Sequence, residues 1–171
     1  MQNYFELFDL KTSFFVDDDA LKKAYQTQVT RFHPDNFSTK SQAEQLQALQ
    51  NTSLVNSAYT ALKTPLNRAS YLLNLEDVDP FDEKDTNMDA NFLLSQIELR
   101  EQLEGIKEQQ DSLALDEFIE RVQDFIRDNV ASISEAFMQS KDLQEIKTLV
   151  RELKFYDQLN KEANILMDEW L

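Results

Sequence analysis

The chain has 171 residues, of which 42% are hydrophobic and 11% aromatic, so it is long and apolar enough to bury a core. Its net charge of −15 argues against nucleic acid or an anionic membrane as the main partner, because both require clustered lysine and arginine. The absence of cysteine excludes disulfides, thiolate nucleophiles and Cys-ligated zinc or iron–sulfur sites.

The composition also predicts the fold class. A single glycine and three prolines leave little material for tight β-turns, while Leu, Gln, Glu, Lys and Ala are abundant, so we expect an all-α protein. No apolar run approaches the roughly 18 to 20 residues of a membrane span, and the acidic N-terminus is neither a signal nor a transit peptide. We therefore expect a cytoplasmic protein without a membrane segment.

Charge is distributed unevenly. Residues 1–76 carry seven basic and eight acidic side chains, so almost all of the excess negative charge belongs to the rest of the chain. Two segments of such different balance indicate two functional surfaces.

The first part of the chain predicts a short, aromatic-rich opening helix and then a longer helix that ends at a sharp corner. Asp17–Asp19 supply an N-cap and first-turn negative charge. The helix should stop at His33, because a residue before proline is pushed out of the α region and Pro34 has no N–H to donate. His33, Pro34 and Asp35 then form an exposed corner that could serve in recognition or could be an ordinary helix stop. The approach helix bears three basic side chains, Lys22, Lys23 and Arg31.

A second long helix follows the corner. Ser41 and Glu44 have the spacing of a capping box, and the apolar period continues to Leu62. Thr64 and Pro65 then read as the N-cap and first residue of a short helix. The two long helices should form an antiparallel hairpin that carries the His33 corner at one tip.

The acidic, proline-containing stretch that follows interrupts the apolar period and predicts a boundary. We expect an N-terminal domain of residues 1–76, a linker of residues 77–87 and a C-terminal domain of residues 88–171. The last domain should be an antiparallel bundle of three helices, near 89–109, 113–138 and 141–169.

The first helix of this bundle carries two apolar faces. One is a complete core stripe within roughly 40° of one line, made by Phe92, Gln96, Leu99, Leu103 and Ile106. Leu93, Leu94 and Ile97 fall on the opposite side. Phe155 of the last helix also departs from its neighbours' stripe. Either another part of the protein packs over these residues, or they form an exposed docking patch.

The sequence offers little for catalysis. The only histidine has no cysteine and no Glu-x-x-His partner, so we expect no metal site. One glycine is too few for a phosphate-binding loop, a dinucleotide fingerprint or a nucleophile elbow. We therefore expect an adaptor that needs no cofactor, and no enzyme.

These features together resemble a known family. The His33-Pro34-Asp35 corner, Tyr4-Phe5 and the segment 55–62 (VNSAYTAL) closely resemble a J-domain of DnaJ-type co-chaperones. Segments 92–101 (FLLSQIELRE) and 150–155 (VRELKF) resemble the HscB (Hsc20) family, co-chaperones of iron–sulfur cluster assembly. The cysteine-rich zinc element of eukaryotic relatives is absent, so a bacterial-type member is the better match. One departure is Asn36, where J-domains often have lysine.

The resemblance implies a two-ended adaptor. The J-domain would stimulate ATP hydrolysis by a dedicated DnaK-class chaperone of the HscA type, and the bundle would deliver an IscU-type scaffold protein to it. The chaperone-binding residues would be Lys22, Lys23, Arg31, His33, Pro34 and Asp35. The scaffold-binding residues would be Leu93, Leu94, Ile97, Glu98, Glu101 and Phe155. Two alternatives are a general J-domain co-chaperone for unfolded clients and a purely structural helical adaptor.

Overall fold

The computed structural model of the chain describes residues 2–85 and 88–171. Over these residues the only regular secondary structure is helical, which confirms the all-α expectation. The elements are α1 (Tyr4–Leu7), α2 (Asp18–Arg31), the 3₁₀ helix η1 (Pro34–Phe37), α3 (Gln42–Lys63), α4 (Pro65–Leu75), α5 (Ala90–Gln109), α6 (Ser112–Met138) and α7 (Leu143–Trp170). They form two compact units, one ending at Leu75 and the other beginning at Glu76. None of the helices in the described ranges is both long and apolar enough to cross a bilayer.

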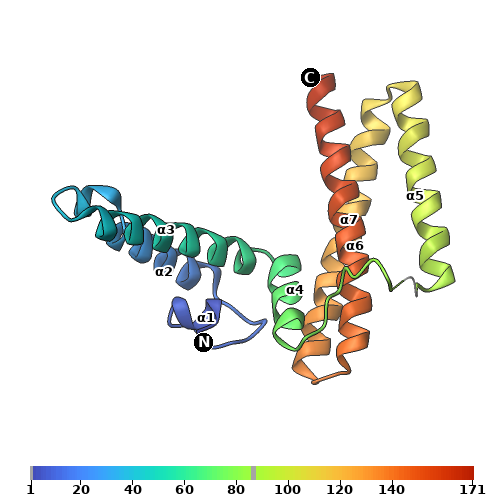
Figure 1. Cartoon of the computed structure of the whole chain (residues 1–171). Helices are drawn as coiled ribbons and strands as arrows, with labels where there is room; N and C mark the ends of the chain where they lie inside the picture. Colours follow the sequence, from blue (N-terminus) through green and yellow to red (C-terminus); the bar gives the residue numbers. More distant parts are fainter. Residues whose placement is uncertain (1, 86–87) are drawn as a thin grey trace. The chain divides into compact units, whose positions relative to one another are not determined.

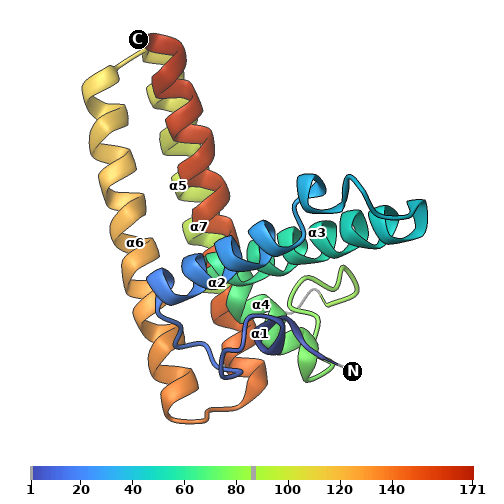
Figure 2. The same ribbon diagram turned by 90° about the vertical axis from the view of Figure 1, so that its left-hand side faces the viewer.

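The N-terminal unit is built on the antiparallel pair α2 and α3, with η1 at the tip of the hairpin (Figures 1 and 2). Its core is made by apolar residues of α1, α2 and α3 and of the turn after α1, namely Phe5, Phe8, Leu21, Val55, Ala58 and Leu62. The one-turn α1 is held by tertiary contacts, as its brevity predicts. Tyr4 stacks on Tyr71 of α4 at 4.8 Å, and its backbone N–H donates to the Tyr71 hydroxyl at 2.9 Å.

The helix starts follow the predicted caps. The Asp17 carboxylate accepts the N–H of Asp19 at the start of α2. At the start of α3, the Glu44 N–H donates to the Ser41 hydroxyl, and the Ser41 N–H donates to the Glu44 carboxylate, each at 3.2 Å. This reciprocal pair is the expected capping box, and it fixes where the chain leaves the corner.

The C-terminal unit is the predicted antiparallel bundle, in which α6 and α7 extend beyond the start of α5 (Figure 1). The predicted core stripe of α5 is confirmed, because Phe92, Leu99 and Leu103 are buried and Gln96 and Ile106 are partly buried. The stripe packs on residues of both other helices, namely Leu115, Phe118, Ile119, Val122, Phe155, Leu159 and Ala163.

The described part of the acidic segment 77–87 packs within the C-terminal unit. Asp85 forms ion pairs with Lys147 and Arg151 of α7, and the Arg151 guanidinium also donates to the Asp85 carbonyl at 2.9 Å. Residues 86 and 87, which complete the predicted linker, lie outside the described residues. The segment next to them is thus attached to α7.

Candidate functional site: two protein-interaction surfaces

The corner of the N-terminal unit forms as the local sequence requires. α2 ends at Arg31, and His33 adopts an extended conformation with ψ of 135°, as expected of a residue before proline. The His33 Nδ1 accepts the backbone N–H of Asp35 at 3.2 Å. The proton of a neutral imidazole then resides on Nε2, the nitrogen that remains available to a partner. The corner presents an N–H donor from His33 beside the exposed Asp35 carboxylate.

Side chains from η1 and α3 brace this corner. The Asn36 amide donates to the Thr30 carbonyl at 2.8 Å, which satisfies one of the open carbonyls at the end of α2. The Gln45 amide donates to carbonyls of the loop 37–40, and the Thr52 hydroxyl donates to the carbonyl of the α2 C-cap residue at 3.2 Å. The corner is therefore held in one shape before any partner binds, and Asn36 contributes a backbone contact where J-domains often have a lysine charge.

The three cations expected on the helix that leads to the corner are all exposed. Lys22 and Lys23 form no ion pair within the described residues, so their charges are available to a partner. The Arg31 guanidinium lies 5.2 Å from the ring centroid of Phe32 at the end of the same helix. Arg31 lies in the last turn of α2 next to the corner, whereas Lys22 and Lys23 lie roughly 15 Å back along the same helix.

The second candidate surface is the outward face of α5. Leu93, Leu94 and Ile97 have exposed fractions of 42%, 59% and 55%, and Glu98 and Glu101 beside them are also exposed. An apolar cluster rimmed by carboxylates is typical of a protein-binding surface. We call Leu93, Leu94 and Ile97 the α5 patch.

The expectation that Phe155 lies off the core is wrong. Phe155 is only 8% exposed, and its ring packs edge-on against Phe92 at 5.8 Å. The cause is that α7 is covered by α5 along only part of its length, so the direction it buries changes along the helix. Phe155 lies beneath the exposed surface, with the Arg100 guanidinium 5.5 Å above its ring.

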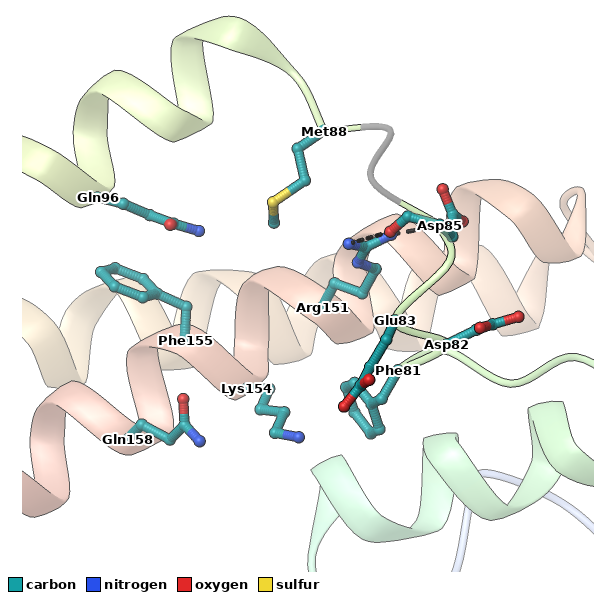
Figure 3. Close-up of a pocket in the computed structure, with 10 residues that line it drawn as sticks. All are labelled: Phe81, Asp82, Glu83, Asp85, Met88, Gln96, Arg151, Lys154, Phe155 and Gln158. Atoms are coloured by element: carbon teal, nitrogen blue, oxygen red, sulfur yellow. Dashed lines mark hydrogen bonds and ion pairs between the residues drawn. The ribbon is translucent and has the colours of Figure 1, made fainter.

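A hollow of about 570 Å³ lies on one side of Phe155 and was not predicted from the sequence (Figure 3). Its walls come from α5, from α7 and from residues 81–85, which we call the strap. Lys147, Arg151 and Lys154 recur at four and three residues on α7 and all contact the strap. That basic stripe, opposite an acidic segment, is the signal in the sequence that could have indicated the contact.

Comparisons with known proteins identify both units. A DnaJ domain family model matches residues 3–71, and a model described as the HscB C-terminal oligomerisation domain matches residues 88–164. A protein named co-chaperone protein HscB homolog from Aliivibrio salmonicida is 38% identical over 170 residues, covering 99% of each chain. The corresponding protein of Photobacterium profundum is 37% identical over 165 residues, covering 96% of each. The chain belongs to the HscB family of co-chaperones.

Solved structures of HscB proteins agree with this assignment. Chaperone HscB from Vibrio cholerae is 37% identical and superposes with a TM-score of 0.87, covering 99% of this chain and 100% of that one. Human co-chaperone HscB is 31% identical with a TM-score of 0.89, covering 96% of this chain and 82% of that one. The predicted J-domain and HscB resemblance are confirmed. Within the described residues, no three His, Asp or Glu side chains are grouped so as to hold a metal ion.

A partly buried carboxyl group lies in the HscB-type bundle near the start of α5. Burial, and to a lesser extent the neighbouring Asp89 carboxylate, raises the pKa of Glu152 above its ordinary value. The buried Asn129 amide lies 3.5 Å from the Glu152 carboxylate, at the limit of a hydrogen bond. The pKa of Tyr156 is also raised, by burial and by Glu152. Glu152 therefore carries its charge in an unfavourable position.

This position predicts how stability depends on pH. The pKa of Glu152 is higher in the folded than in the unfolded state, so ionising this carboxyl destabilises the fold. This loss of folding free energy is absent below the ordinary value of 4.5 and appears as pH rises through the folded pKa. Glu152→Gln should therefore raise the free energy of unfolding at pH 7, and the gain should disappear near pH 4. Urea denaturation at both pH values measures this, with Glu120→Gln, an exposed position on α6, as the matched control. An equal gain at both pH values would contradict the assignment.

Proposed function

We propose that this chain stimulates the ATPase of a dedicated, HscA-type DnaK-class chaperone and delivers an IscU-type scaffold protein to it during iron–sulfur cluster biogenesis. The observation that carries the proposal is the presence of two exposed surfaces on separate units, the braced His33 corner and the α5 patch, in a chain of the HscB family. Each surface exposes groups suited to binding a protein partner.

The His33 corner is the proposed contact with the chaperone. The His33 Nε2–H and the Asp35 carboxylate are an exposed donor and acceptor on a backbone fixed by Pro34. Lys22, Lys23 and Arg31 would steer the hairpin toward an acidic surface of the chaperone, since they are cations in an acidic protein. ATP hydrolysis takes place in the chaperone, so this chain acts as a stimulator without an active site, cofactor or metal of its own.

The α5 patch is the proposed contact with the scaffold protein. Its three apolar side chains would be buried by the scaffold, while Glu98 and Glu101 at the margin would select a partner with basic groups. Phe155 would act from beneath, by supporting α5 through Phe92. Hydrolysis on the chaperone would then retain the scaffold and promote cluster transfer. The cytoplasmic location expected from the sequence stays a prediction.

The chaperone contact is tested by His33→Gln. The exposed imidazole buries little surface, so the variant should fold normally but lose nearly all stimulation of steady-state ATP hydrolysis. Circular dichroism and scaffold binding, which use the other unit, are the internal controls. A variant that still stimulates the chaperone fully would contradict the role of the corner.

The scaffold contact is tested by the double variant Leu93→Ala, Leu94→Ala. Losing the centre of the patch should weaken scaffold binding by at least ~2 kcal/mol, which corresponds to roughly thirtyfold in Kd. Titration calorimetry measures this, and Leu113→Ala, which truncates an exposed leucine on α6, is the matched control. Phe155 is omitted because truncating a buried phenylalanine costs about 3–5 kcal/mol of stability. Unchanged affinity with an intact fold would contradict the patch, and selective binding of unfolded polypeptides would favour a general co-chaperone.

A further inference from the structure

We propose that the hollow between the strap and α7 is part of the client-binding site and receives an apolar side chain of the scaffold protein. The inference rests on the proposed function, because it adds a subsite to the α5 patch. It gives the strap, which precedes α5 in the C-terminal unit, a direct role in client recognition.

The strap is anchored at both ends by α7. At one end the mostly buried Lys147 and Arg151 both contact Asp85, and the Arg151 Nη1 lies 3.4 Å from the carboxylate. At the other end the Lys154 ammonium lies 4.0 Å from the centroid of the Phe81 ring. Partly buried ion pairs and a close cation–π contact hold a segment more firmly than exposed surface pairs do. The strap is therefore a stable wall in the absence of a partner.

The hollow offers apolar surface to whatever enters it. Figure 3 shows the Phe155 ring, the Met88 thioether and the Phe81 ring around an open centre, with Arg151 and Lys154 between them. Both cations are already engaged, Arg151 by Asp85 and Lys154 by Phe81. An anionic ligand would have to compete with these contacts and with the carboxylates on the strap. An apolar side chain would instead cover the partly exposed Phe81 and Met88 side chains and the remaining edge of Phe155 without breaking any contact.

The hollow and the α5 patch are neighbours on α5. Gln96 lines the hollow and is followed directly by Ile97. At 100° per residue, Gln96 lies about 60° from Leu93 around α5, at the edge of the core stripe that is nearest to the patch. A scaffold segment that covers the patch therefore lies next to the α5 wall of the hollow. The proposed occupant of the hollow is therefore a side chain of the partner that binds the patch.

The experiment compares variants of the hollow for binding to an IscU-type scaffold by calorimetry with the full chain. Phe81→Ala removes one wall, Asp85→Asn weakens the anchor, and Gln158→Trp fills the hollow from its α7 rim. Each should raise the Kd at least about fivefold, the scale of one contributing interface residue. Asp77→Asn, which makes the same charge change at an exposed residue of the segment 77–87 that does not line the hollow, should leave the Kd within about twofold. Stimulation of the chaperone without scaffold should be unchanged in all four.

The outcomes separate this inference from the proposed function. If the wild-type chain does not bind the scaffold, the proposed function fails. If the wild type binds, Leu93→Ala, Leu94→Ala weakens binding and the hollow variants bind normally, only the subsite is overturned. Phe81→Leu keeps an apolar wall and should restore most of the affinity lost in Phe81→Ala. If circular dichroism shows that Phe81→Ala unfolds the unit, Asp85→Asn and Gln158→Trp decide the question, and normal binding by both overturns it.

Discussion

The edge-on packing of Phe92 against Phe155 and Tyr156 determines which face of α5 the C-terminal unit exposes. Both contacts join α5 to α7 with ring centroids 5.8 Å apart and planes nearly perpendicular, the geometry that aromatic pairs favour. With Phe92 fixed against α7, the helical period requires Leu93, Leu94 and Ile97 to point away from the core. The patch is thus exposed because the aromatic pair buries the other face of α5. The hollow beside Phe155 depends on the same packing, since Phe155 forms one of its walls.

Features fixed by local chemistry could be predicted from the sequence. Pro34 ends a helix through its own ring and missing N–H, and the Ser41–Glu44 capping box forms within a single turn. The core stripe of α5 could also be predicted, because a helix that packs one face against one core repeats its apolar residues with a simple period. The corner and the patch, the two surfaces of the proposed function, are both of this local kind.

Features that depend on distant segments could not be predicted in the same way. The apolar stripe of α7 does not predict the burial of Phe155, because a single stripe cannot reveal that α7 is covered by α5 over only part of its length. The acidic, proline-containing sequence of residues 77–87 predicts a linker but does not reveal its attachment to α7, because the partners of Asp85 are Lys147 and Arg151, more than sixty residues away. The braces from Gln45 and Thr52 likewise become visible only when α3 folds back on the corner.

The central claim is that one chain joins the two partners through separate surfaces. The most direct test is the scaffold-dependent ATPase rate of the DnaK-class chaperone, measured with subsaturating scaffold. Wild type is compared with an equimolar mixture of His33→Gln and the Leu93→Ala, Leu94→Ala double variant. If delivery requires both surfaces on the same molecule, the mixture should reach only the sum of the two variants measured alone, well below wild type. A mixture that matches the wild-type rate would contradict the account.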